Sequence, residues 1–152
     1  MNKKGFTLIE LLIVVAIIGI VAAIAIPNLL TALQKGKQKA TMGDMKTIGN
    51  AIGAYLETMS MVPDGLDMVG LILLEPNFTK RIPRTDGWNF GWHYARSGTT
   101  ALPDTYSVGS GGKGGVFSWA HAAGQYIAVA MADFESDIIF SEGVFIYGPK
   151  VK

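Results

Sequence analysis

The apolar residues near the start of the chain form one nearly unbroken run. Residues 6–26 carry a single charged side chain, Glu10. A helix of this length spans about 30 Å, which is the thickness of the hydrocarbon core of a bilayer. Because Lys3 and Lys4 precede the run, the positive-inside rule places the N-terminus in the cytoplasm. The pattern predicts a membrane-spanning helix over residues 6–27, and the residues after it are expected to be exported.

A cleaved secretory signal is the competing interpretation of the same run. Lys3 and Lys4 would supply its basic region, and Ala23-Ile24-Ala25 would supply a cleavage site. The apolar run is longer than the usual signal core of about 7–15 residues, and it contains Glu10 near its start. Both features favour the membrane-spanning helix.

The pattern changes to an amphipathic helix over residues 28–60. Steps of three and four residues from Met45 onward put the apolar side chains on one face. Pro27 precedes this segment, and it predicts either a kink or a melted stretch near residues 24–27, or the end of the first helix. Three cations, Lys35, Lys37 and Lys39, form either a solvated face or a contact with acidic headgroups or a neighbouring subunit.

The remaining residues, 61–152, predict a small α+β head. A turn at Pro63-Asp64-Gly65 ends the long helix. The expected elements after it are a short helix over 66–74 and strands over 92–96, 105–108, 126–131, 138–140 and 144–147. The last two strands are expected to form a hairpin through Ser141-Glu142-Gly143. The apolar stripe of the long helix is expected to cover this antiparallel sheet.

Composition and charge exclude several classes of function. The net charge of +1 is too small to produce the positive electrostatic potential that nucleic-acid binding requires. There are no cysteines, so disulfides and thiolate metal sites are excluded. Five of the 19 glycines fall within residues 109–115. The GSGGKGG stretch there lacks the spacing of a phosphate-binding loop, and His93 and His121 have no metal-ligand spacing around them.

The residues around the start of the apolar run resemble a known processing motif. Residues 4–15 read KGFTLIELLIVV, and the match continues through Ile18-Gly19-Ile20 and Ile26-Pro27-Asn28. This sequence is similar to the leader and N-terminal helix of type IV prepilins and type II secretion pseudopilins. The resemblance implies that residues 1–5 are a leader, that a prepilin peptidase cuts after Gly5, and that the new amine on Phe6 is methylated.

Glu10 is the unusual residue of the apolar run. A carboxylate inside a bilayer costs about 2.5–3.5 kcal/mol at the centre and less near an end, where it can reach the headgroups. Cleavage after Gly5 removes two lysines and creates a cation on Phe6. A low dielectric strengthens the attraction between opposite charges and penalises an unpaired charge. Glu10 of one subunit is therefore expected to pair with the Phe6 amine of the next and to fix the register between helices.

Several parts of the head resemble the major pseudopilin of type II secretion systems. These are Asp86-Gly87-Trp88-Asn89, Tyr94, residues 106–112 and Asp137-Ile138. The resemblance implies a non-enzymatic subunit held in the bacterial inner membrane with its head in the periplasm. It implies a helical homopolymer as partner, together with minor pseudopilins and an inner-membrane assembly platform. The filament would push substrates through an outer-membrane channel.

Two alternatives to that function stay open at this point. A type IV pilin of a surface fibre shares the N-terminal motif, although such pilins commonly contain a disulfide that this cysteine-free chain cannot form. A membrane-anchored periplasmic binding or enzymatic domain would carry the leader by coincidence. In the second case Glu10 could be changed without consequence.

The resemblance also implies a calcium site in the loop over residues 107–137. Its oxygen ligands would come from a small set of side chains: Ser107, Ser110, Asp137 and Asp104, with Asp133 and Glu135 as substitutes. Calcium takes about 6–8 oxygen ligands, and glycines allow carbonyl groups to turn inward. Gly111 stands where the family has an aspartate. A glycine-rich loop with solvated acids is therefore the alternative interpretation.

Overall fold

A computed structural model describes residues 5–97, 105–120, 124–126, 128 and 131–150 of the chain. The chain divides into two compact units, residues 1–33 and residues 34–152. The long helix α1, Leu8–Met59, runs through both units.

Within the first unit α1 contains Pro27 without ending there. Residues 24–27 are helical, and the Thr31 hydroxyl donates a hydrogen bond to the Pro27 carbonyl oxygen at 3.0 Å. The predicted termination and the predicted melted turn at this proline are therefore wrong. A proline inside a helix removes only one backbone donor, and the turns on both sides of it keep their own hydrogen bonds.

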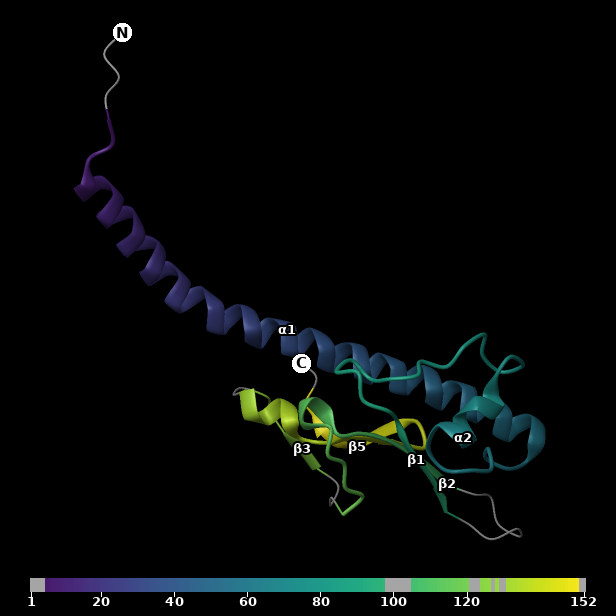
Figure 1. The fold of residues 1–152 in the computed structure, drawn as a ribbon. Coiled ribbons are helices and arrows are strands. Elements are labelled where there is room, and N and C mark those ends of the chain that lie inside the picture. The colour runs from purple at the N-terminus through teal and green to yellow at the C-terminus, as the bar shows by residue number, and fades with distance from the viewer. Residues whose placement is uncertain (1–4, 98–104, 121–123, 127, 129–130, 151–152) are drawn as a thin grey trace. The chain divides into compact units, whose positions relative to one another are not determined.

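The second unit contains the sheet (Figure 1). Its strands are β1 (His93–Ser97), β2 (Thr105–Ser110), β3 (Gly124–Tyr126), β4 (Ile138–Ser141) and β5 (Val144–Pro149). Their order is β1-β2-β4-β5-β3. All neighbouring pairs are antiparallel except β3 with β5, which are parallel. The predicted α+β class is confirmed, and the sheet is mostly antiparallel.

Short helices complete the second unit. α2 (Asp67–Leu71) continues into the 3-10 helix η1 (Ile72–Leu74), which confirms the predicted short helix over 66–74. Two further 3-10 helices, η2 (Gly112–Gly114) and η3 (Met131–Glu135), lie between β2 and β4. Because Met131 begins η3, the strand predicted over 126–131 is wrong. The actual strand, β3, lies earlier, and residues 127, 129 and 130 are outside the described part.

The core of the second unit lies between α1 and the sheet. Met45, Ile48 and Ile52, spaced three and four residues apart, are completely buried. The contact is close, because a Cβ added at Gly49 would lie 2.3 Å from the Phe140 ring on β4. Other fully or almost fully buried members include Leu71, Leu74, Ile82, Trp92, Tyr94, Val108, Phe134 and Ile138. The predicted stripe of α1 is therefore confirmed as the cover of the sheet.

Candidate functional site

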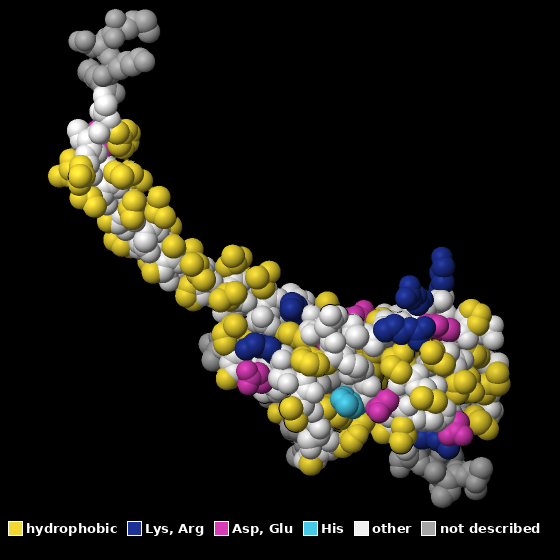
Figure 2. Space-filling view, in the orientation of Figure 1, with side chains coloured by type: hydrophobic (Ala, Val, Ile, Leu, Met, Phe, Trp, Pro, Cys, Tyr) yellow, Lys and Arg dark blue, Asp and Glu magenta, His cyan; other side chains and the backbone are white. Residues whose placement is uncertain are grey.

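The apolar helix of the first unit has no protein cover. Its large side chains are mostly half to three-quarters exposed, from 78% at Phe6 to 44% at Leu30. Figure 2 shows hydrophobic side chains along the visible face of this part of the helix. By length and composition α1 is able to cross a membrane. A helix that is apolar all round requires lipid or other apolar helices as its environment.

The helix begins with a capping box formed by Thr7 and Glu10. The Thr7 backbone N–H and hydroxyl donate to Glu10 Oε2 at 2.8 and 2.7 Å, and the Glu10 N–H donates to Thr7 Oγ1 at 3.3 Å. This arrangement satisfies backbone donors that every helix start leaves open. Glu10 therefore has a local partner that the sequence interpretation missed, although the Thr-x-x-Glu spacing is a recognised signal for it.

The three predicted processing and assembly residues lie at the N-terminal end of α1. Gly5 and Phe6 precede the first turn and are exposed, and the Glu10 carboxylate lies at that turn. The positive end of the helix dipole also favours a carboxylate at this position. Cleavage after Gly5 and the pairing of Phe6 with Glu10 of another subunit stay predictions.

In the second unit Asp86 is the centre of a buried hydrogen-bond network. It is 5% exposed. Its Oδ1 accepts the Trp88 and Phe90 backbone N–H groups, both at 2.9 Å, and its Oδ2 accepts the Ser110 hydroxyl at 2.6 Å. A buried carboxylate is tolerated when its oxygens are satisfied in this way. Asp86 therefore joins the 86–90 loop to the end of β2.

The same loop is fixed to α1 by two contacts. The Gly87 N–H donates to Thr41 Oγ1 at 3.0 Å, and Trp88 Nε1 donates to Gln34 Oε1 at 2.6 Å. A Cβ at Gly87 would lie 2.5 Å from the Lys37 carbonyl oxygen. Only glycine permits so close an approach of the loop to the helix. The Asp86-Gly87-Trp88-Asn89 sequence thus has a structural explanation in this chain.

The serines proposed as calcium ligands are occupied in other hydrogen bonds. Ser110 is buried; its hydroxyl donates to Asp86 Oδ2, and its hydroxyl oxygen accepts the Gly112 N–H at 3.1 Å. The Ser107 hydroxyl contacts Ser141 Oγ on β4 at 3.1 Å. Asp137 Oδ2 accepts the Ser118 N–H at 3.0 Å. Asp104 lies outside the described residues.

These residues do not fit a calcium site as they stand. Calcium requires several convergent oxygens, whereas the structure engages Ser107, Ser110 and Asp137 with three different partners. Within the described ranges no group of three or more acidic or histidine side chains is placed to hold a metal ion. Calcium binding stays a prediction. Calorimetric titration of the full chain in detergent would contradict it by giving no heat and no thermal shift.

His93 has a structural environment rather than a ligand set. Its Nδ1 lies 3.7 Å from Asp67 Oδ1, and its ring stacks on Phe117 with 4.4 Å between centroids. His121 lies outside the described residues. The aromatic residues on either side of His93, Trp92 and Tyr94, are buried in the core.

Comparisons with known proteins give a consistent family. Residues 1–26 match the family described as the prokaryotic N-terminal methylation motif. The chain is 30% identical over 126 residues to the type II secretion system core protein G of Pseudomonas aeruginosa, covering 75% of this chain and 88% of that protein. It is 29% identical over 125 residues to the core protein G of Vibrio cholerae, covering 75% and 85%.

A type IV pilin matches over a shorter stretch. The chain is 42% identical over 69 residues to the type IV major pilin protein PilA of Myxococcus xanthus, covering 45% of this chain and 31% of that protein. The pilin relationship is the weaker of the two, because its match covers less of this chain than the matches to core protein G. No solved structure matches the chain.

The methylation motif, the uncovered apolar helix and the α+β head define a type IV pilin-like protein. The matches to core protein G cover three quarters of the chain, more than the N-terminal motif alone could supply. The chain belongs to the family of the type II secretion system core protein G, the major pseudopilin.

Proposed function

We propose that this chain is a structural subunit of a type II secretion pseudopilus, which polymerises through its N-terminal helix and drives protein export across the outer membrane. The observation that carries the proposal is the match to core protein G over most of the chain. The role requires no catalysis by the chain itself. Cleavage and methylation would be done to it by a prepilin peptidase.

The apolar first unit supports a subunit that moves from lipid into a filament. Before assembly its side chains would lie in the inner membrane, with the N-terminus cytoplasmic and the head periplasmic. An assembly platform would then extract the helix. Bundling with other copies and with minor pseudopilins would replace lipid contacts by helix packing, which keeps the same side chains out of water.

Glu10 would set the register of this bundle. Its carboxylate is already held at the first turn by Thr7. After cleavage the Phe6 amine of a neighbouring copy would approach that carboxylate in a low-dielectric environment. Either charge left alone there is costly, so misregistered packing is disfavoured.

The capping box provides a direct test of this role. Glu10→Gln preserves a capping-box side chain but removes the charge, whereas Thr7→Ala removes the cap but keeps the charge. If the charge sets the register, Glu10→Gln abolishes filaments and export while Thr7→Ala retains both. Filaments would be counted by electron microscopy in cells that also produce a type II assembly platform. Normal assembly by Glu10→Gln together with loss in Thr7→Ala would assign Glu10 to capping alone.

The mature N-terminus tests the processing step. Mass spectrometry of the protein from cells with a prepilin peptidase is expected to find a chain that begins at N-methylated Phe6. An intact Met1 or an unmethylated start at Ile26 would contradict the proposal. Gly5→Leu should block cleavage and leave residues 1–5 in place.

The surface-fibre alternative makes a different prediction. The match to the Myxococcus xanthus type IV major pilin favours it only over 45% of the chain. A pilin role would give long external filaments and no loss of exported proteins on deletion of the gene. A pseudopilin role would give loss of export.

A further inference from the structure

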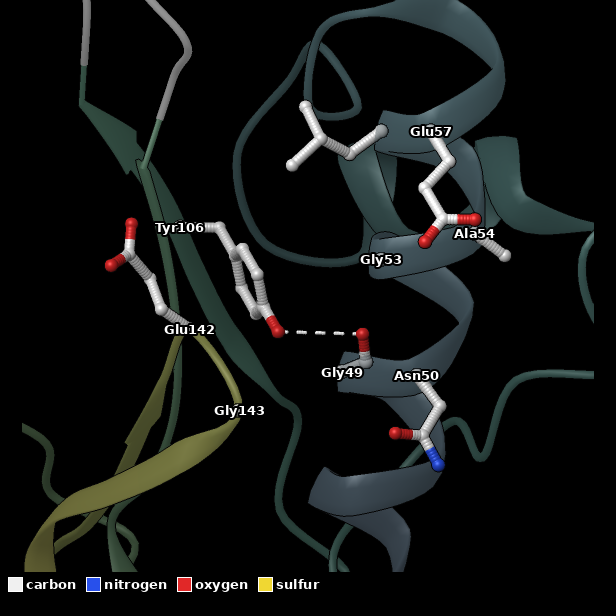
Figure 3. A pocket seen from close by; sticks show the side chains of 9 residues that line it. Gly49, Asn50, Gly53, Ala54, Glu57, Tyr106, Glu142 and Gly143 are labelled. Atoms are coloured by element: carbon white, nitrogen blue, oxygen red, sulfur yellow. Dashed lines mark hydrogen bonds between the residues drawn. The ribbon is translucent and has the colours of Figure 1, made fainter.

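A groove lies between the last turns of α1 and the β4–β5 turn (Figure 3). It has a volume of about 530 Å³. The residues that line it include Gly49, Gly53, Glu57, Tyr106, Glu142 and Gly143. Three of the lining residues from α1, Gly49, Gly53 and Ala54, are small, which would allow a second backbone to approach closely. Figure 3 shows Glu57 on the helix side and Glu142 on the turn side, with Tyr106 between them.

The charge of this groove is negative. Glu57 and Glu142 are exposed, and within the described part of the chain neither takes part in an ion pair. Two lining residues of the groove are tied together, because the buried Tyr106 hydroxyl donates to the Gly49 carbonyl oxygen at 3.3 Å. Burial raises the pKa of Tyr106, and the charge of Glu142 adds to that rise. A cationic occupant would complement these walls.

Glu142 stands in a position that is unfavourable for glutamate. It and Gly143 have φ of +48° and +89°, as the two central residues of a tight hairpin turn require. Asparagine or glycine is preferred at the first of these positions, whereas glutamate is strained there. A strained acid at the rim of an acidic groove indicates a use beyond folding.

The chain itself offers a cation that fits a parallel assembly. Subunits that repeat in one direction must contact each other through two different faces. At about 100° per residue, Lys37 lies 160° from Gly53 and 200° from Glu57 around the axis of α1, which is the opposite side of the helix. Lys35 and Lys39 share the side of the groove. Lys37 is exposed, as are its small neighbours Gly36 and Ala40.

Other cations are less suited to this contact. Arg84 is paired with Glu75 at 2.8 Å, and the charge of Arg81 acts on the same carboxylate. The ammonium of Lys46 lies 5.8 Å from the centre of the Phe145 ring. Lys80 is exposed on the loop after η1 and serves as a control.

We propose that this groove receives α1 of a second copy of the chain, with Lys37 of that copy paired to Glu57 and Glu142 supplying further negative charge. This inference rests on the proposed function, since it names a contact between heads in the filament. Lys37 and the groove lie 16–20 residues apart on α1. The two copies are therefore shifted along the helix by about 24–30 Å.

Chemical cross-linking tests the contact directly, because the parent chain has no cysteines. In assembled filaments of Lys37→Cys/Glu57→Cys, a short bis-maleimide should give a ladder of trimers and larger products. Each subunit then contributes two different cysteines to two neighbours. Lys35→Cys/Glu57→Cys and Lys39→Cys/Glu57→Cys should give no such ladder. Equal ladders from all three pairs, or a ladder only from a control pair, would overturn the proposal.

Charge reversal supplies a second readout. Lys37→Glu and Glu57→Lys should each lower filament yield by about tenfold, because like charges at an interface are strongly unfavourable. The double variant should restore the yield, and Lys80→Glu should leave it unchanged. Loss of filaments with Lys80→Glu but not with Lys37→Glu would assign the groove to a different cation.

Glu142→Asn separates assembly from folding. Asparagine tolerates a positive φ, so this variant should unfold at a higher temperature and yet form fewer filaments. A variant with higher stability and unchanged assembly would exclude Glu142 from the contact. If the parent chain formed no filaments, the proposed function itself would fail. Filaments of the parent that give no Lys37–Glu57 cross-link would overturn this inference alone.

Discussion

The two units of the chain treat apolar residues in opposite ways, although α1 runs through both. Ile17 in the first unit is 55% exposed, whereas Ile48 in the second is completely buried. The first unit is apolar on every side, so its own chain cannot cover it. The second unit has one apolar stripe, which a single sheet can cover. One helix therefore contains a segment without protein cover and a segment that packs in the core of the head.

The strongest test of this difference is the same substitution, isoleucine to aspartate, in both units. Ile48→Asp places an unpaired charge in the core and should destabilise the head by about 4 kcal/mol or more. Ile17→Asp should leave head unfolding unchanged, because that side chain has no role in the core. Its cost of about 3 kcal/mol should appear in membrane insertion instead. Thermal unfolding of the full chain in detergent and membrane fractionation measure the two effects. Equal loss of head stability in both variants would contradict the division.

Asp86→Ala sharpens the comparison by removing a polar centre that exists only in the second unit. Two backbone N–H groups and the Ser110 hydroxyl lose their acceptor. The expected loss is about 3 kcal/mol of unfolding free energy, measured by denaturant titration. Asp64→Ala is the matched control. Its side chain is 77% exposed and pairs with Arg96 at 2.8 Å, so its loss should be below about 1 kcal/mol.

Gly87→Ala tests the close approach between the 86–90 loop and α1. The added methyl group would lie 2.5 Å from the Lys37 carbonyl oxygen. The loop must then move away from the helix, at an expected cost of about 2 kcal/mol. Gly91→Ala, where an added Cβ meets nothing within 4 Å, should change unfolding little. A loss in Gly91→Ala equal to that in Gly87→Ala would indicate a general effect of the methyl group.

The smallest expected effect is a pH dependence located in the second unit. The Ile82 N–H, with Arg84 and Arg81, holds the pKa of Glu75 below its ordinary value of 4.5. A depressed folded-state pKa adds stability above the unfolded value and loses it as pH falls through the folded value. The melting temperature of the parent should therefore fall below about pH 4.5. Glu75→Gln should fall less over the same range, and an unchanged slope would contradict the assignment.

Much of the architecture followed from local patterns. The spacing of Met45, Ile48 and Ile52 predicted the buried face of α1, and the apolar run over 6–26 predicted a helix without protein cover. The terminal hairpin between β4 and β5 also followed from alternation around a turn. These features depend on residues that are close in sequence, so their spacing predicts them without a structure.

Pairings between distant residues did not follow from those patterns. The strand β3 was placed too late, because its parallel pairing with β5 gives only a three-residue element. Asp86 gave no sign that it would accept the Ser110 hydroxyl across 24 residues. The capping box is a different case, since Thr7 and Glu10 have the required spacing and the signal was overlooked.

The sequence by itself determined the apolar helix that is long enough to cross a membrane, the N-terminal methylation motif and the α+β class, because each depends on the order and spacing of neighbouring residues. Tertiary structure alone decided which polar groups are buried together and where a groove opens. Gly53, Tyr106 and Glu142 come from a helix, a strand and a turn. Only the packing of those elements brings them to one surface, since no local period relates them.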